Sequence, residues 1–214
     1  MTKQKNPYKR PDAFTKAAKA RGYPARSVFK LEEIDRRVRL LRPGQRVLDL
    51  GAAPGSWSLY AAQRIGPSGK LLAIDLTPIL VPLGPTAHFS CGDALSLANE
   101  DLAMFAPYDV VLSDMAPSTT GSKFTDQARS FELFMRALAI AEALGVPAPE
   151  HASSAAAPRG AFVGKLFMGE DFTPAREALR ALFAEVRVLR PEGTRSSSVE
   201  VFLVGLGRKP KAGA

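Results

Sequence analysis

Short apolar runs alternate with amphipathic segments along most of the chain, and this alternation constrains the fold more than any other feature. The apolar runs predict strands at Arg46–Leu50, Lys70–Ile74, Ala87–Ser90, Tyr108–Leu112, from Ala161, at Val186–Leu189 and at Val199–Leu206. Helical spacing predicts helices at Ala13–Ala20, 24–42, Ser58–Ile65, Ser96–Phe105, Asp126–Leu144 and Ala175–Phe183. Strands that alternate with helices are typical of a doubly wound α/β sheet with mostly parallel strands.

The last two predicted strands are separated by Arg190–Ser198, which is too short for a helical crossover. We therefore expect the last strand of a seven-stranded sheet to be antiparallel. The 214 residues suit one domain, which we place at residues 24–214, after a basic arm at residues 1–23. Residues 145–159 are rich in Pro, Ala and Ser and predict a flexible surface loop.

Positive charge is concentrated near the N-terminus. Residues 1–46 hold 14 Lys or Arg against 4 Asp or Glu, a net charge of +10, whereas the remaining residues have a net charge of −2. Such asymmetry is typical of a protein that binds a polyanion, and it favours nucleic acid as the partner. A solubilising tail and an anchor to an anionic membrane are the alternatives.

Composition excludes several classes of protein. Apolar runs are interrupted before 18 residues, so we expect no transmembrane helix, and the N-terminus lacks the apolar stretch of a secretory signal. Cys91 is the single cysteine, and His88 and His151 are the two histidines. We therefore expect neither a disulfide framework nor a structural metal, and we expect a cytoplasmic protein.

A glycine-containing turn, Asp49-Leu50-Gly51-Ala52-Ala53-Pro54-Gly55-Ser56-Trp57, follows the first predicted strand and opens a helix. Ligands of open α/β sheets bind at the carboxyl ends of strands, where glycines let them approach the backbone. The spacing G-x-x-x-G differs from the dinucleotide and phosphate-loop fingerprints, which disfavours a pyrophosphate. The turn is similar to the S-adenosylmethionine loop of Rossmann-like methyltransferases, and a plain tight turn is the alternative.

Acidic residues follow the next two predicted strands. Asp75 ends the second strand, 24 residues after Gly51, where a carboxylate can accept hydrogen bonds from both ribose hydroxyls of a nucleoside cofactor. Asp93 follows the third strand, at a position that borders the adenine in this fold. A helix cap for Asp75 and a turn for Asp93 are the competing interpretations.

Four further charged residues lie in unusual places. Asp114 follows the fourth strand within Ser113-Asp114-Met115-Ala116-Pro117, where a cap or an Asx turn is the alternative to chemistry. Lys165 and Glu200 lie inside apolar strands, where an unpaired charge is costly, so a purely structural ion pair between them is one interpretation. Lys30, on the first long helix, would by itself be a surface lysine.

Together these pieces resemble the FtsJ/RlmE family of ribosomal RNA ribose 2′-O-methyltransferases. Arg26–Ile34 resembles the family's N-terminal helix, Asp49–Trp57 its cofactor loop, and Ser113–Pro117 its S-D-M-A-P turn. The resemblance extends from about residue 7 to residue 210. The sequence departs from the family's pattern at Ser56, Gly164, loop 145–159 and Ser196–Val199, which leaves the RNA contacts open.

The resemblance implies a Rossmann-like, S-adenosylmethionine-dependent methyltransferase fold and a set of site residues. The implied catalytic tetrad is Lys30, Asp114, Lys165 and Glu200, with Lys165 as the proton acceptor. The implied contacts to S-adenosylmethionine are Gly51, Gly55, Trp57, Asp75, Asp93 and Asp114. No metal is implied, and we expect a monomer that binds ribosomal RNA or the large ribosomal subunit through its basic arm.

The tetrad suits a hydroxyl acceptor. A ribose 2′-hydroxyl is a poor nucleophile while it holds its proton, whereas the sulfonium donor is already a good electrophile. Free lysine is a poor base at neutral pH, and a neighbouring Lys30 and the donor's positive sulfur would favour loss of the proton from Lys165. We assign Asp114 and Glu200 to orientation. Cys91 is the only thiol and lies beside the expected adenine site, which argues against a covalent thiolate mechanism.

The resemblance therefore implies 2′-O-methylation of a uridine ribose in 23S large-subunit ribosomal RNA. The same reaction on tRNA is the closest alternative, although the S-D-M-A-P turn favours the ribosomal branch. A non-catalytic RNA-binding factor for ribosome assembly is a second alternative, against which the intact tetrad argues. The missing G-x-G-x-x-G disfavours a nucleotide-dependent oxidoreductase.

Overall fold

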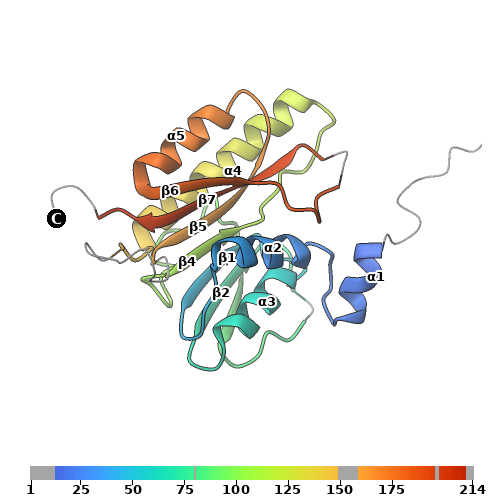
Figure 1. The fold of residues 1–214 in the computed structure, drawn as a ribbon, viewed down its shortest axis with the longest axis vertical. Helices are drawn as coiled ribbons and strands as arrows, with labels where there is room; N and C mark the ends of the chain where they lie inside the picture. Colours follow the sequence, from blue (N-terminus) through green and yellow to red (C-terminus); the bar gives the residue numbers. More distant parts are fainter. Residues whose placement is uncertain (1–12, 80, 149–158, 196–197, 211–214) are drawn as a thin grey trace, which may run out of the picture.

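A seven-stranded sheet with the order β3-β2-β1-β4-β5-β7-β6 forms the centre of the molecule (Figure 1). The computed structural model describes residues 13–79, 81–148, 159–195 and 198–210. The strands are β1 (Arg46–Leu50), β2 (Lys70–Asp75), β3 (Ala87–Cys91), β4 (Val110–Ser113), β5 (Ala161–Phe167), β6 (Phe183–Leu189) and β7 (Glu200–Arg208). Strand β7 is antiparallel to β5 and β6, and the other neighbours are parallel. The predicted, mostly parallel sheet with an antiparallel last strand is confirmed.

Helices cover both faces of the sheet (Figure 1). They are α1 (Ala13–Ala20), α2 (Val28–Val38), α3 (Ser56–Ile65), α4 (Lys123–Leu144) and α5 (Phe172–Leu182). Helices α2 and α3 bury their apolar residues against one face, in a core that also contains Val47 and Leu112. Helices α4 and α5 bury theirs against the other face, in a core that contains Leu48 and Val111. The two cores follow from the period of two in a β-strand.

The same alternation brings polar side chains to one face of the sheet at its carboxyl edge. Ala73, Val163 and Phe202 belong to the core beneath α2 and α3. Each of these three apolar residues has a charged residue two positions away on its own strand, β2, β5 or β7. Side chains two residues apart share a face. The residues so placed are Asp75, Lys165 and Glu200, and Asp114 follows Leu112 of β4 in the same way.

Helix α1 packs against the domain rather than extending from it. Ala18 and Tyr23 are buried in the core that α2 and α3 cover. The guanidinium of Arg26 lies 5.1 Å from the ring centroid of Phe14, which adds a cation–π contact between α1 and the start of α2. Residues 1–12 of the predicted arm, and residues 149–158 of the predicted loop, lie outside the described residues.

The prediction of a helix over residues 24–42 is too long at both ends. Helix α2 ends at Val38, and Arg39 adopts a left-handed conformation with φ of 53°. Beyond it, the carboxylate Oδ1 of Asp35 accepts a hydrogen bond from the Leu41 N–H at 2.8 Å. This bond stabilises a turn that buries Leu40 and Leu41, so the apolar spacing continues although the helix has ended.

The predicted helix Ser96–Phe105 is wrong, because the segment forms successive turns. Asp93 accepts the Ser96 and Leu97 N–H groups with its carbonyl and the Leu95 N–H with its carboxylate. Local bonds of this kind compete with helix formation. The side chain of Arg136 also binds the Ala94 and Leu97 carbonyls, which a helix would use internally. The other predicted boundaries differ from the observed ones by a few residues.

Asp35 joins α2 to α3 through a buried polar cluster. Its carboxylate is 3 % exposed and accepts hydrogen bonds from Tyr60 at 2.8 Å and from Arg64 at 3.1 Å, besides the Leu41 N–H. Loss of the acceptor leaves buried donors without partners.

We expect Asp35→Ala to lower the free energy of unfolding by about 3 kcal/mol, because three donors lose their acceptor. Arg64→Ala should cost less than about 1 kcal/mol, since the Arg64 side chain is half exposed and its partner keeps two other donors. Urea unfolding followed by circular dichroism measures both. Equal losses for the two variants would contradict the role of Asp35 as the centre of the cluster.

Candidate functional site

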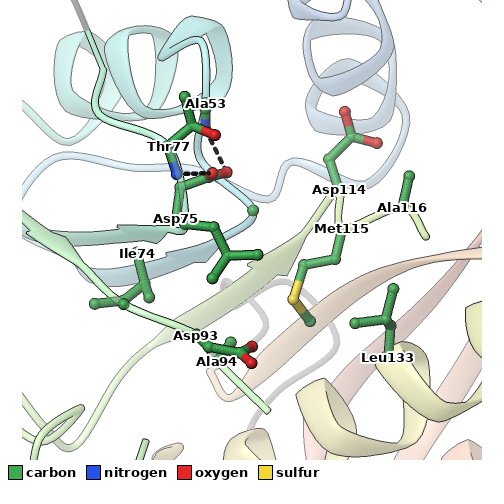
Figure 2. Close-up of a pocket in the computed structure, with 13 residues that line it drawn as sticks. Ala53, Ile74, Asp75, Thr77, Asp93, Ala94, Asp114, Met115, Ala116 and Leu133 are labelled. Atoms are coloured by element: carbon green, nitrogen blue, oxygen red, sulfur yellow. Dashed lines mark hydrogen bonds between the residues drawn. The ribbon is translucent and has the colours of Figure 1, made fainter. Parts of the chain in front are cut away.

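A cavity of about 360 Å³ lies at the carboxyl edge of β1, β2, β3 and β4. Residues from the loops after these strands and from α4 surround it (Figure 2). The lining residues are Gly51, Ala53, Ile74, Asp75, Leu76, Thr77, Gly92, Asp93, Ala94, Asp114, Met115, Ala116 and Leu133. Four predicted cofactor contacts, Gly51, Asp75, Asp93 and Asp114, are therefore in its wall.

The loop after β1 lies directly against the loop after β4. A Cβ atom on Gly51 would lie 2.7 Å from Cγ of Met115 and 2.8 Å from its backbone nitrogen, and Gly51 also has a φ of +78°. Both the space and the backbone conformation thus require glycine. The Asp114 N–H donates to the Leu50 carbonyl at 3.2 Å, which fixes the two loops together. The glycine turn and the S-D-M-A-P turn form one continuous wall.

Asp75 is fixed by two backbone hydrogen bonds. Its Oδ2 accepts from the Ala53 N–H and its Oδ1 from the Thr77 N–H, each at 2.8 Å (Figure 2). A carboxylate has about four lone-pair sites, so each oxygen of this cavity-lining residue retains an acceptor site. The helix cap expected as the alternative for Asp75 is not formed, because both N–H groups that its carboxylate accepts lie in loops. Asp93 forms the turn expected as its alternative, because its Oδ1 accepts the Leu95 N–H, and it also lines the cavity.

The structure does not bring Gly55 and Trp57 to this wall. The Trp57 side chain is 2 % exposed, its indole N–H donates to the Ser27 carbonyl at 2.9 Å, and its ring lies 5.6 Å from that of Phe202. Gly55 has a φ of +106°, and a Cβ there would lie 2.5 Å from Val81. Trp57 thus holds the start of α2 against the sheet.

The four residues of the predicted tetrad form two ion pairs. The Lys165 ammonium donates to Oδ1 of Asp114 at 2.9 Å and to the Asp114 carbonyl. The Lys30 ammonium, on α2, pairs with the Glu200 carboxylate at the start of β7. All four side chains are at least mostly buried, and that of Lys165 is 7 % exposed. Strands β4, β5 and β7 and helix α2 together supply the cluster.

The structural ion pair between Lys165 and Glu200, the alternative to a catalytic role, is not formed, and these two pairs take its place. In the antiparallel register of β5 and β7, Lys165 lies opposite Phe202, and Glu200 lies opposite Phe167. On the other side of β5, Gly164 lies beside Ser113 of β4. The residues that follow these two are Lys165 and Asp114, which are therefore neighbours. The register therefore directs Lys165 toward Asp114, and Glu200 toward α2.

A second cavity of about 380 Å³ opens beside the Lys30–Glu200 pair. Its lining residues are Arg26, Ser27, Lys30, Gly193, Arg195, Ser198 and Glu200. Burial lowers the pKa of Arg26, the nearby Arg195 lowers it further, and Glu200 opposes the shift. The cavity thus gathers three cations around one carboxylate. Arg26 and Arg195 were not predicted as site residues, although Arg26 belongs to the basic N-terminal region.

Helix α2 also holds the connection between β6 and β7 that closes this second cavity. Arg26 donates to the Gly193 carbonyl at 2.7 Å, and the Glu33 carboxylate accepts the Glu192 N–H at 2.7 Å. Arg26, just before α2, and Glu33, on α2, therefore hold the segment that carries Arg195 near Lys30.

Asp49 is a buried acid beneath the site. Its side chain is fully buried, Oδ2 accepts the Ser58 hydroxyl at 2.6 Å, and Oδ1 has no hydrogen-bond partner among the described residues. Burial raises the pKa of Asp49 to about 7. The Ser58 hydrogen bond opposes the rise, and the Asp114 and Asp75 carboxylates add to it.

The described part of the chain holds no group of three or more His, Cys, Asp or Glu side chains arranged to bind a metal ion. Within the same residues, no helix has the length and apolar character to cross a membrane.

Comparison with known proteins identifies the family. The model of the FtsJ-like methyltransferase family matches residues 23–208. The chain belongs to the FtsJ-like methyltransferase family. It is 75% identical over 207 residues to "Ribosomal RNA large subunit methyltransferase E" of Sorangium cellulosum, with 97% of this chain and 92% of that protein covered. It is 48% identical to the protein of the same name from Nitratidesulfovibrio vulgaris, with 92% and 94% covered.

Solved structures show the same fold. A ribosomal RNA methyltransferase from Plasmodium falciparum has a TM-score of 0.68 at 22% identity, with 87% of this chain and 98% of that chain covered. As in other FtsJ-like methyltransferases, the reaction is transfer of a methyl group, so the prediction of a methyltransferase is confirmed.

The environment of Asp49 predicts how stability depends on pH. The folded state binds the Asp49 proton more tightly than the unfolded state does, so its contribution is present below about pH 4 and is lost as pH rises through about 7. Asp49→Asn cannot ionise. We expect the free energy of unfolding of Asp49→Asn, relative to wild type, to rise by up to about 4 kcal/mol between pH 4 and pH 8.

Urea titrations of both proteins across this pH range measure the difference. Ser58→Ala removes the hydrogen bond that favours the ionised form, so it should move the midpoint of the wild-type curve to higher pH. A difference between wild type and Asp49→Asn that does not vary with pH would show that Asp49 does not titrate in this range.

Proposed function

We propose that this FtsJ-like methyltransferase transfers a methyl group from S-adenosylmethionine to the 2′-hydroxyl of a uridine ribose. The uridine lies in the 23S ribosomal RNA of the large subunit. We also propose that the protein works as a monomer in the cytoplasm. Two relatives at 75% and 48% identity are named ribosomal RNA large subunit methyltransferases, which supports this substrate. The observation that carries the proposal is the ion pair between Lys165 and Asp114, because Asp114 also lines the first cavity, which contains Gly51 and Asp75.

The first cavity suits S-adenosylmethionine, which supplies an electrophilic methyl group when it is bound. Asp75 presents acceptor sites for two ribose hydroxyls, and Asp93 presents a carboxylate for an exocyclic amine. Gly51 keeps the backbone close, and Ile74, Ala94 and Leu133 add apolar surface. In this arrangement Asp114 borders the cofactor on one side and Lys165 on the other.

The chain's own residues position the acceptor and remove its proton. Lys165 is held by the Asp114 carboxylate and carbonyl at the rim of the cavity. Once this ammonium has released a proton to solvent, the neutral amine would accept the proton of a ribose hydroxyl that enters from the second cavity. Glu200 holds Lys30 beside the same rim, so the four charges orient one another. Arg26 and Arg195 share the second cavity, and a phosphate between them would relieve their repulsion.

The role of Lys165 is tested by methyl transfer to large ribosomal subunits from cells that lack the corresponding methyltransferase. We expect tritium from labelled S-adenosylmethionine to enter 23S ribosomal RNA with the wild-type protein. Lys165→Ala and Lys165→Arg should lower the rate at least about 100-fold, since a guanidinium stays protonated. Calorimetry should show unchanged cofactor affinity for Lys165→Ala.

Near-normal turnover by Lys165→Arg would exclude Lys165 as the proton acceptor. Labelling of tRNA in place of 23S ribosomal RNA would overturn the proposed substrate and leave the chemistry intact.

We further propose that the basic N-terminal region contributes RNA affinity. Residues 1–12 carry four Lys or Arg against one Asp, and Ala18 is buried in the core, so the chain is best shortened before α1. Removal of residues 1–12 should weaken binding to 23S ribosomal RNA and reduce the slope of log affinity against log salt by about 2 to 3. Filter binding between 50 and 300 mM salt measures the slope, and an unchanged slope would mean that these residues do not contact phosphates.

A further inference from the structure

A third cavity, of about 320 Å³, lies beside the second one. Its lining residues are Thr119, Gly121, Lys123, Asp126, Gln127, Phe167, Ser198 and Val199. Ser198 also lines the second cavity, so the two meet at this residue. Phe167 follows Lys165 by two positions on β5, which places the third cavity next to the tetrad. A strand of RNA whose ribose reaches Lys165 would therefore extend over both cavities.

Apolar groups are unusually exposed around the third cavity. Phe124 is 73 % exposed, and Val199 and Met168 are 41 % and 40 % exposed. The Met168 N–H donates to the Val199 carbonyl at 2.9 Å, so these two lie together. Phe124 stands one helical turn before Gln127, a lining residue, and hence on the same side of α4. A phenylalanine at the mouth of a cavity, with its ring in solvent, suits a flat aromatic ligand.

The second and third cavities differ in chemistry as the phosphate and the base of a nucleotide differ. The second gathers Arg26, Lys30 and Arg195, which suit a phosphate. The third has Phe167 and Val199 in its wall and Phe124 beside it, which suit a base, and Thr119 adds a hydroxyl for a base edge. Proteins that bind single-stranded RNA combine such a basic track with aromatic groups on which bases stack.

We propose that the third cavity, with Phe124 beside it, is a nucleobase subsite, and that a base of the substrate strand close to the methylated ribose stacks on Phe124. The inference rests on the proposed function, from which it takes the class of ligand. It adds where the strand lies beyond the tetrad and which side chain holds a base there.

The test uses the full chain and two fluorescein-labelled decamers in fluorescence anisotropy. One is decauridylate, and the other is a ribose-phosphate decamer of the same charge without bases. Phe124→Ala should raise the Kd for decauridylate about 5- to 100-fold and leave that for the abasic decamer unchanged. Phe124→Trp should restore the affinity. Met104→Ala is the matched control, because Met104 is 52 % exposed and lies in the segment before β4, at the opposite edge of the sheet.

Three results would overturn the subsite: no effect of Phe124→Ala on decauridylate, an equal loss for both decamers, or no binding of decauridylate by the wild type. Self-association that Phe124→Ala abolishes, without a change in RNA affinity, would instead assign Phe124 to a contact between two copies of the chain. Methyl transfer to 23S ribosomal RNA is measured with the same preparations. If methyl transfer occurs but the Kd for decauridylate does not depend on Phe124, only the subsite is refuted. If the Kd depends on Phe124 but no methyl transfer occurs, only the proposed function is refuted.

Discussion

The contact between Gly51 and Met115 is the constraint on which the rest of the site depends. The backbone of the loop after β1 lies so close to the loop after β4 that no Cβ atom fits between them. This contact makes one wall from two turns that are far apart in the sequence. It also places Asp114 between the first cavity and Lys165, so that one residue borders both the proposed cofactor and the proposed base. A larger residue at position 51 would separate these functions.

Much of the fold was predictable because it follows from local periodicity. The strands Arg46–Leu50 and Lys70–Asp75 and the helix Ala13–Ala20 have patterns that need no tertiary information, and the short connection before β7 is sufficient to predict its direction. The end of α2 and the segment after Asp93 were not predictable in this way. In both places an Asp side chain binds backbone N–H groups, which stops or replaces a helix without changing the apolar spacing.

The sequence was sufficient to predict which residues belong to the site, but not which of them form ion pairs with one another. Asp75, Asp114, Lys165 and Glu200 each stand out as charge next to an apolar strand, and period two brings them to one face. The partner of each charge depends on the register between strands, which the sequence does not contain in local form. The register between β4 and β5 places Lys165 beside Asp114, and Glu200 forms its ion pair with Lys30 on α2. Arg195 reaches the site through a loop that α2 holds, and no local pattern indicates this.

The central claim is that this wall and tetrad direct a methyl group to a ribose oxygen, and alkaline digestion tests it most directly. Alkali cleaves RNA through the 2′-hydroxyl, so a methylated ribose protects the next phosphodiester bond. Large-subunit RNA labelled with tritium from S-adenosylmethionine would be digested to completion and separated by charge. The account predicts that the label is recovered in alkali-stable dinucleotides. Label recovered in mononucleotides would show that the methyl group is on a base, and it would contradict the role given to Lys165.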